Sequence, residues 1–303
     1  MNKKLHFLAL SLLFILVGCG EKKSDPANSK AETAVTDSDP AKVPDAWIEN
    51  RVAKAKEKLE ASEAGKIVWK AMEAHGGLSQ WFSNGPISFH FNYQPLGEGT
   101  PRNTYQVIDT WSSRARHFSA VDSTQQYGWT GEKAWEMVKD STVFAYDTRF
   151  WSLTPFFFMG QPFVLEGDGT NLELLEQVDY NDYMYDVVKV TFEAGTGDAP
   201  DDYYVLYFNT KSHKLGVIRY IVSYPGYFEE GNHAPEKFMD LLGEQTASGI
   251  IFPENYKTYW LNEENGPGEH ITDIELSDIE FLPKLKDSYF EIPESAKVSE
   301  ENL

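Results

Sequence analysis

The stretch PISFHFNYQPL, residues 86–96, decides the fold class of this chain. Apolar Ile87, Phe89, Phe91 and Tyr93 alternate with polar residues, which is the period of a strand that buries one face. Further segments of strand-like composition follow it, and Gly, Pro, Asn or Asp bounds most of them. Because no helical segments alternate with these strands, the pattern favours an antiparallel meander over a parallel α/β sheet.

Two local patterns predict how the strands connect and bend. Residues 209–213 provide a natural hairpin connection between two strand segments. In the last segment, Ile274 and Leu276 are followed by Ile279 and Phe281, so the apolar phase slips by one residue. That slip predicts a β-bulge, which bends a strand. The expected fold class is therefore mainly β (α+β), with one strongly curved antiparallel sheet.

Helices are expected before the strands. Asp45 is expected to cap a helix over residues 46–62, where apolar residues recur near the helical period. A second helical stretch begins near residue 67 and should stop at Gly76-Gly77, because glycine accepts a left-handed backbone without steric cost. His75, just before this stop, is expected to interact favourably with the helix C-terminus.

Residues 149–165, RFWSLTPFFFMGQPFVL, interrupt the strand pattern with a mostly aromatic and aliphatic run. The run is too short and too polar for a transmembrane helix, which needs about 20 apolar residues. Thr154 as an N-cap, followed by Pro155, predicts a short helix that Gly160 closes. Its rings would surround about one turn, because consecutive helical residues point about 100° apart. Such a helix is buried on most sides or lies against an apolar cavity.

The N-terminus reads as an export signal. Lys3 and Lys4 precede an apolar stretch over residues 7–17, which has signal-peptide length. The sequence LVGC, residues 16–19, resembles the lipobox of bacterial lipoproteins, and this resemblance implies cleavage before Cys19 and acylation of its thiol. The alternative is a plain signal peptide followed by an accidental cysteine. Cys19 is the only cysteine, so the chain can form neither an internal disulfide nor a cysteine-based zinc site.

The expected organisation follows from these signals. A lipoprotein signal peptide would occupy residues 1–18, and a flexible tether of small, polar and proline residues would follow the acylated cysteine over residues 19–44. A single domain is expected over residues 45–293, with a C-terminal tail over residues 294–303. The expected location is the bacterial cell envelope, at the outer membrane, with the periplasmic or surface face left open.

The net charge limits the partners. The chain has 47 acidic and 27 basic residues, for a formal net charge of -20. Nucleic-acid binding depends on neutralising phosphates with Lys and Arg, so no nucleic acid is expected. A basic docking face for anionic lipid is equally unexpected. Membrane attachment would instead come from the N-terminal lipid anchor.

Several motifs resemble those of exported bacterial domains with a LolA/LolB-like fold. They are AHGGLSQW at residues 74–81, YGWTGEKAWEM at 127–137, ASGIIFPENYKTYW at 247–260 and DSYFEIP at 287–293. A more specific similarity, to a family of bacterial lipoproteins of unknown function, is carried by FFFMGQPFVL at residues 156–165 and GTGDAPDDYYVLYFNTKSHKLGVIRYIVSY at 195–224. The resemblance implies an incomplete β-barrel with helices over an apolar cavity, in a class whose members carry lipoprotein acyl chains or sense envelope lipids. The lipobox then favours an anchored receptor over a released shuttle.

Catalytic motifs are missing from the sequence. It contains no G-x-S-x-G, no Walker A and no H-E-x-x-H, and its histidines are scattered. We therefore expect no enzymatic activity, no cofactor and no metal site. Asp198, Asp201 and Asp202 could bind calcium through carboxylate oxygens. Their spacing fits no calcium loop, so a solvated turn is the expected structure.

Aromatic residues carry the remaining functional signal. The candidates for lining an apolar binding site are Trp111, Trp129, Trp135, Trp151, Phe156, Phe157 and Phe158. Two functions stay open: an anchored protein that binds an acyl chain, lipid or lipoprotein, and an envelope scaffold with a filled core that binds a partner protein. A cavity of several hundred Å3 under residues 149–165 would favour the first.

Overall fold

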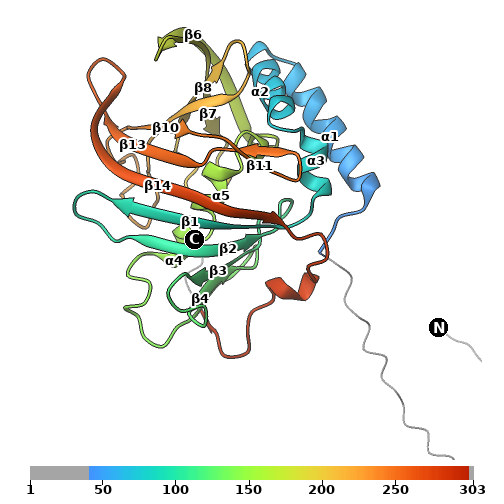
Figure 1. The fold of residues 1–303 in the computed structure, drawn as a ribbon, viewed down its shortest axis with the longest axis vertical. Helices are drawn as coiled ribbons and strands as arrows, with labels where there is room; N and C mark the ends of the chain where they lie inside the picture. The colour runs from blue at the N-terminus through green and yellow to red at the C-terminus, as the bar shows by residue number, and fades with distance from the viewer. Residues whose placement is uncertain (1–40, 300–303) are drawn as a thin grey trace, which may run out of the picture. The chain divides into compact units, whose positions relative to one another are not determined.

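The computed structural model describes residues 41–299, which form one dominant antiparallel sheet with helices against it (Figure 1). The strands are β1 Ile87–Pro95, β2 Arg102–Ile108, β3 Ala115–Ser119, β4 Gln126–Trp129, β5 Ala134–Met137, β6 Thr170–Tyr180, β7 Tyr183–Phe192, β8 Tyr204–Asn209, β9 Leu215–Tyr220, β10 Lys237–Leu242, β11 Gln245–Ala247, β12 Ile250–Phe252, β13 Asn255–Leu261, β14 Pro267–Phe281 and β15 Lys297–Val298. The helices are α1 Asp45–Glu60, α2 Glu63–Ala74, α3 Leu78–Ser83, α4 Thr148–Trp151 and α5 Thr154–Met159, with 3-10 turns η1 Phe163–Leu165 and η2 Asp287–Phe290. The predicted signal peptide, Cys19 and most of the predicted tether lie outside the described residues.

The main sheet has 13 strands in the order β15-β5-β4-β3-β2-β1-β14-β13-β10-β9-β8-β7-β6. It consists of two meanders, β1–β5 and β6–β10, which β14 and β13 join in the middle. The sheet is strongly curved and is not closed into a barrel, since its edge strands β15 and β6 do not pair with each other. The predicted fold class, a curved antiparallel sheet with few helices, is confirmed.

The predicted bulge and hairpin are both present. Ser88 of β1 pairs with Glu280 of β14, but His90 pairs with Ser277, so β14 carries one extra residue at this point. Asp278 within the bulge has a φ of 52°. The hairpin over residues 209–213 connects β8 and β9, which pair in antiparallel register.

The two long helices differ in how they begin. Helix α1 starts at Asp45 itself, and its N-cap is Pro44 without a side-chain cap, so the prediction that Asp45 is the cap was wrong. The Asp45 carboxylate lies instead in the first turn, where its negative charge interacts favourably with the positive end of the helix dipole. Helix α2 is capped by the Ser62 hydroxyl, which accepts from the backbone N–H of Gly65 at 3.0 Å.

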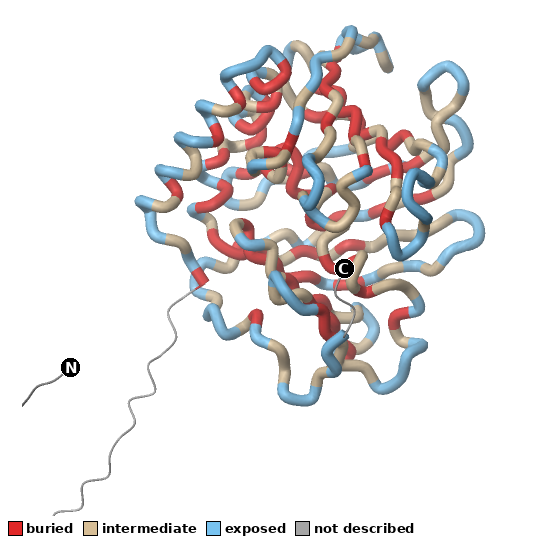
Figure 2. The backbone as a smooth tube through the Cα atoms, turned by 180° about the vertical axis from the view of Figure 1, so that it is seen from behind, coloured by how far each residue is buried: buried red, intermediate tan, exposed pale blue. Residues whose placement is uncertain are grey.

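Helix α2 ends as the sequence predicts. Gly76 and Gly77 have φ values of 117° and 90°, which are left-handed conformations. His75 is buried, and its Nδ1–H donates to the Ala71 carbonyl oxygen at 2.8 Å. Burial lowers the pKa of His75, so the neutral ring meets the helix end through a hydrogen bond. Helices α1–α3 lie together beside the sheet, with their buried residues turned inward (Figures 1 and 2).

Three clusters of buried side chains stabilise this arrangement. The largest lies between the concave face of the sheet and helices α1, α2, α3 and α5. A second cluster, around Phe238 and Tyr207, lies on the opposite face of β7–β10. A third joins Val107 to Phe290, where the C-terminal segment crosses the sheet before β15 pairs with β5. Within residues 41–299, no helix combines the length and apolar character needed to cross a bilayer.

Candidate functional site

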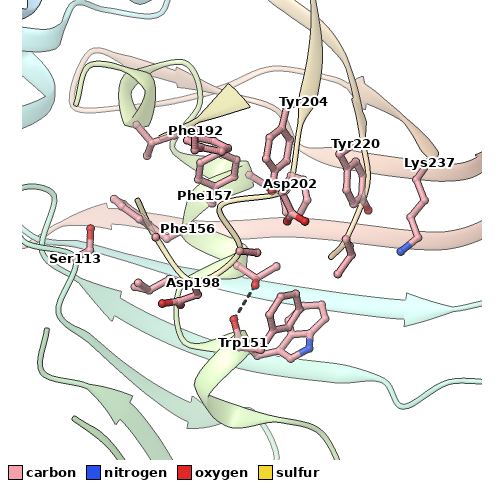
Figure 3. A pocket seen from close by; sticks show the side chains of 18 of the residues that line it. Ser113, Trp151, Phe156, Phe157, Phe192, Asp198, Asp202, Tyr204, Tyr220 and Lys237 are labelled. Atoms are coloured by element: carbon pink, nitrogen blue, oxygen red, sulfur yellow. Dashed lines mark hydrogen bonds between the residues drawn. The ribbon is translucent and has the colours of Figure 1, made fainter. Parts of the chain in front are cut away.

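A cavity of about 590 Å3 lies between the concave face of the sheet and the segment that contains α4 and α5 (Figure 3). Besides α4 and α5, its lining comes from β1, β2, β14 and β6–β10, and from the segments over residues 164–168, 193–203 and 221–236. Most lining side chains are aromatic or aliphatic, with a few charged groups among them. The cavity therefore lies beneath the aromatic run that the sequence singled out.

Helix α5 forms from this run, but Thr154 is not its cap. The N-cap is Leu153, and the Thr154 hydroxyl donates back to the Phe150 carbonyl oxygen at 2.7 Å. Because α4 ends only two residues before α5, Leu153 stays in a near-helical conformation and does not adopt the extended geometry of a capping residue. Gly160 ends the helix as expected, and its N–H donates to the Phe156 carbonyl oxygen at 2.7 Å.

The three consecutive phenylalanines of α5 point in three directions. Phe156 stacks near Trp81 of α3, with ring centroids 5.9 Å apart. Phe157 contacts Tyr204 of β8 at 4.7 Å, and Phe158 contacts Tyr220 of β9 at 4.9 Å. All three line the cavity, as does Trp151 of α4. The structure therefore brings four of the seven candidate aromatic residues to one site, while their binding of a ligand stays a prediction.

The other three tryptophans do not line the cavity. Trp135 of β5 lies against Gly128 of β4, where an added Cβ would come within 2.6 Å of the indole. Trp129 is covered by Arg149, whose guanidinium carbon lies 3.6 Å from its ring centroid. Trp111 follows β2 and packs between the largest core cluster and the C-terminal one. Aromatic content alone could not separate these residues from the four that reach the cavity.

Polar contacts hold α4 and α5 against the sheet. His117 of β3 is fully buried, and its Nε2–H donates to the Ser152 carbonyl oxygen at 2.9 Å. Its ring stacks on Tyr127 with centroids 4.3 Å apart. The Thr148 hydroxyl of α4 donates to the Glu136 carboxylate of β5. Burial lowers the pKa of His117 to about 3, so this histidine is neutral and Nε2 carries its proton.

One side of the cavity, which we call the aromatic wall, consists of Phe157, Phe192, Tyr204 and Tyr220. The sequence pointed to Phe157 but not to the other three. The ring centroids of Phe192 of β7 and Tyr204 lie 6.0 Å apart. Tyr204 is stacked on Tyr220, with centroids 6.1 Å apart and an interplanar angle of 14°. Figure 3 shows these rings side by side along one side of the space. Every residue from Tyr204 to Phe208 is buried, so both faces of β8 are apolar. An alternating pattern that could have shown which face lines the cavity is therefore missing.

Two cations also line the cavity. The Arg102 guanidinium lies 4.1 Å from the ring centroid of Trp151 and 4.8 Å from that of Tyr93. The Lys237 ammonium lies 5.5 Å from the centroids of both Tyr220 and Trp260. Burial lowers the pKa of Arg102, and burial, helped by the charge of Arg102, lowers that of Lys237 to about 8.

The carboxylates of the cavity have partners. Asp168 pairs with Lys54 at 2.6 Å, and Asp198 pairs with Arg149. Asp202 accepts hydrogen bonds from the backbone N–H and the hydroxyl of Ser223 at 2.6 and 2.7 Å. Asp202 is buried, which raises its pKa, so the prediction of a solvated turn was wrong for this residue. Within the described chain, no three His, Cys, Asp or Glu side chains form a group that could hold a metal ion.

No family model and no curated protein sequence matches the chain. Among solved structures, it is similar to a LolA superfamily protein from Nitrosomonas europaea, with 12% identity and a TM-score of 0.44, covering 74% of this chain and 94% of that one. It is also similar to a putative outer membrane lipoprotein-sorting protein domain from Vibrio parahaemolyticus (10% identity, TM-score 0.46, 78% of this chain and 97% of that one). A DUF1329 family protein from Desulfovibrio piger matches at 12% identity and a TM-score of 0.45, over 84% of this chain and 98% of that one.

The fold follows from the topology of the chain itself. The curved, open antiparallel sheet with helices on its concave face is the LolA-like architecture that the sequence motifs led us to expect.

Proposed function

We propose that this protein is a lipid-anchored lipoprotein of the bacterial envelope that binds an apolar ligand in the cavity under α5. The ligand would be an acyl chain, a lipid or the acyl chain of another lipoprotein. The observation that carries the proposal is the volume of the cavity, about 590 Å3. Small-molecule sites typically occupy roughly 300–1,000 Å3 and are lined mainly by apolar and aromatic side chains.

The lining favours hydrocarbon over a polar ligand. The aromatic wall offers ring faces along one side, and Phe156 and Trp151 contribute further apolar surface. Each buried methylene contributes about 0.8 kcal/mol, so a chain of ten would contribute roughly 8 kcal/mol before the cost of association. The charged groups are few, as expected where polar contacts fix the orientation of a ligand.

The anchor and the location rest on the sequence. Acylation at Cys19 would tether the domain to the outer membrane through the segment that ends near residue 44. The proposed role is binding without catalysis, and an envelope protein could donate or receive the ligand. The scaffold alternative requires a filled interior, which the cavity disfavours.

The test measures binding of parinaric acid, a slender fluorescent fatty acid, to the full-length chain with Cys19→Ser. This substitution keeps the anchor's own acyl chains out of the cavity. Val222 lines the cavity, and Val222→Trp should fill it and weaken binding at least about tenfold, a loss of about 1.4 kcal/mol. Val121, 91% exposed in the β3–β4 turn, provides the matched control, and Val121→Trp should bind like the parent. Absence of binding by the parent, or unchanged binding by Val222→Trp, contradicts the proposal.

A further inference from the structure

We propose that Arg102 and Lys237 form a site for an anionic headgroup, so that the ligand is an amphiphile with a carboxylate or phosphate head and an apolar chain. This inference rests on the proposed function and specifies the chemical class of the ligand. It follows from how the described residues distribute charge around the cavity.

The two cations lie on strands that face the same space. Arg102 begins β2 and pairs with Tyr93 of β1, while Lys237 begins β10 and pairs with Tyr220 of β9. Side chains two residues apart share a face of the sheet, so Lys237 shares the inner face with buried Met239. Both cations line the cavity, although they come from opposite meanders.

Neither cation forms an ion pair in the part of the chain that the structure describes, although the charge of Asp202 acts on Lys237 from a greater distance. The three lining carboxylates, in contrast, are all satisfied by a lysine, an arginine or a serine. Arg102 donates one hydrogen bond to the Thr100 carbonyl oxygen at 2.7 Å, but its buried Nε has no partner. No hydrogen bond from the Lys237 ammonium is found among residues 41–299. Desolvating a cation is costly unless an acceptor or an opposite charge compensates, so an unpartnered pair implies that a bound group supplies the compensation.

Aromatic rings hold these cations in place without neutralising them. Arg102 lies over Trp151 and Tyr93, and Lys237 lies beside Tyr220 and Trp260. Such contacts orient and stabilise a cation, but they leave its N–H groups free for an acceptor. In a chain with 47 acidic and 27 basic residues, carboxylates were abundant enough to serve as partners. The arrangement therefore keeps positive charge available inside an acidic protein.

The lining of the cavity also indicates where the head and the tail of a bound amphiphile would lie. The Lys237 ammonium lies 5.5 Å from the ring centroid of Tyr220. The row of rings then runs from Tyr220 to Tyr204, with centroids 6.1 Å apart, and from Tyr204 to Phe157, with centroids 4.7 Å apart. Figure 3 shows Lys237 at one end of this row and Phe157 towards the other. An extended hydrocarbon chain along the aromatic wall would place its charged head at Lys237 and its tail beneath α5. Carboxylate and phosphate oxygens accept charge-assisted hydrogen bonds from both guanidinium and ammonium groups.

The titration of Lys237 gives a second readout. The charged or titratable groups that face its ammonium are Arg102, Asp202 and Tyr220. Burial raises the pKa of Asp202 and raises that of Tyr220 far above neutrality. Of these groups, Lys237 is therefore the one that loses its charge in mildly alkaline solution. The affinity of the cavity for an anion should fall as that charge is lost.

The experiment compares two probes that share one chain, parinaric acid and the uncharged parinaryl alcohol, on the full-length Cys19→Ser protein. The parent should bind the acid at least about tenfold more tightly than the alcohol, as expected for charge-assisted hydrogen bonds. Lys237→Gln and Arg102→Gln should each remove about tenfold of the acid affinity and leave alcohol affinity unchanged. Lys237→Arg should retain the preference. Lys257→Gln, an exposed cation on the neighbouring β13, is the matched control and should behave like the parent.

The outcomes separate this inference from the proposed function. If neither probe binds, the proposed function itself fails. If both probes bind equally, or Lys237→Gln weakens both alike, the apolar site stands and the headgroup site is refuted. Hexanoate and inorganic phosphate serve as competitors. Full displacement of the acid by phosphate alone would identify a free-anion site and overturn the assignment of an amphiphile.

Discussion

Acid should unfold this protein partly through one buried histidine, His117. Its folded-state pKa is about 3, against an ordinary value of 6.5, because burial disfavours the charged ring. Below pH 6.5 the unfolded chain takes up a proton that the folded chain does not, so stability falls as pH falls. The contribution is complete above about pH 6.5 and is lost progressively towards pH 3. At pH 4.5, two pH units below 6.5, the loss from His117 alone is about 3 kcal/mol.

The assay is urea unfolding of the parent and of His117→Gln at pH 7.5 and pH 4.5. Gln does not titrate, and its amide can still donate to the Ser152 carbonyl oxygen that His117 bonds. The parent should lose about 3 kcal/mol more than the variant between the two pH values, since other titrating groups act equally on both. A difference below about 1 kcal/mol would refute the reasoning. Should the variant fail to fold, the His117 ring resonances of the parent, followed by NMR, must show no protonation down to pH 4.5.

Three further predictions concern the ligand, the helix and the anchor. Parinaric acid should lose about fivefold in affinity between pH 7 and pH 9, because the Lys237 ammonium, with a pKa of about 8, is mostly charged at pH 7 and mostly neutral at pH 9. Parinaryl alcohol should bind equally at both pH values. Gly160→Ala should lower the free energy of unfolding by about 1–3 kcal/mol in urea, because the new Cβ would lie 2.8 Å from the Phe156 carbonyl oxygen, whereas Gly97→Ala, with no atom within 4 Å, should change it little. Cys19→Ser should abolish incorporation of labelled palmitate in growing cells, and retained label would show that Cys19 is not the acylated residue.

The strands and their bending could be predicted because period-two patterning is a local property. The alternation in β1 predicted its buried face, and the phase slip after Leu276 placed the bulge where Asp278 adopts a left-handed conformation. The helix caps were less predictable. Asp45 and Thr154 are good capping residues by type, but the backbone before each one sets the helix start elsewhere.

The cavity could be predicted only in part. The run over residues 149–165 indicated an element set against an apolar space, because three consecutive rings cannot share one flat core. Which other aromatics face that space depends on how the sheet curves, so Tyr204 could not be separated from Trp135 by residue type. Nothing in the sequence pointed to Lys237, because whether a lysine has an acidic partner depends on which strands, distant in sequence, lie beside it in the fold.

Strand β14 makes the order of synthesis matter for this protein. Its partners are β1 and β13, and the pairing of Ile87 with Phe281 joins residues separated by most of the described chain. Contacts of such long range form slowly, because much chain entropy is lost before they contribute. The meanders β1–β5 and β6–β10 can each start from local hairpins, but they are joined only when β14 is available. We therefore expect the cavity to be the last feature to mature, and a nascent chain lacking its C-terminal strands to expose two unfinished half-sheets to aggregation or proteolysis.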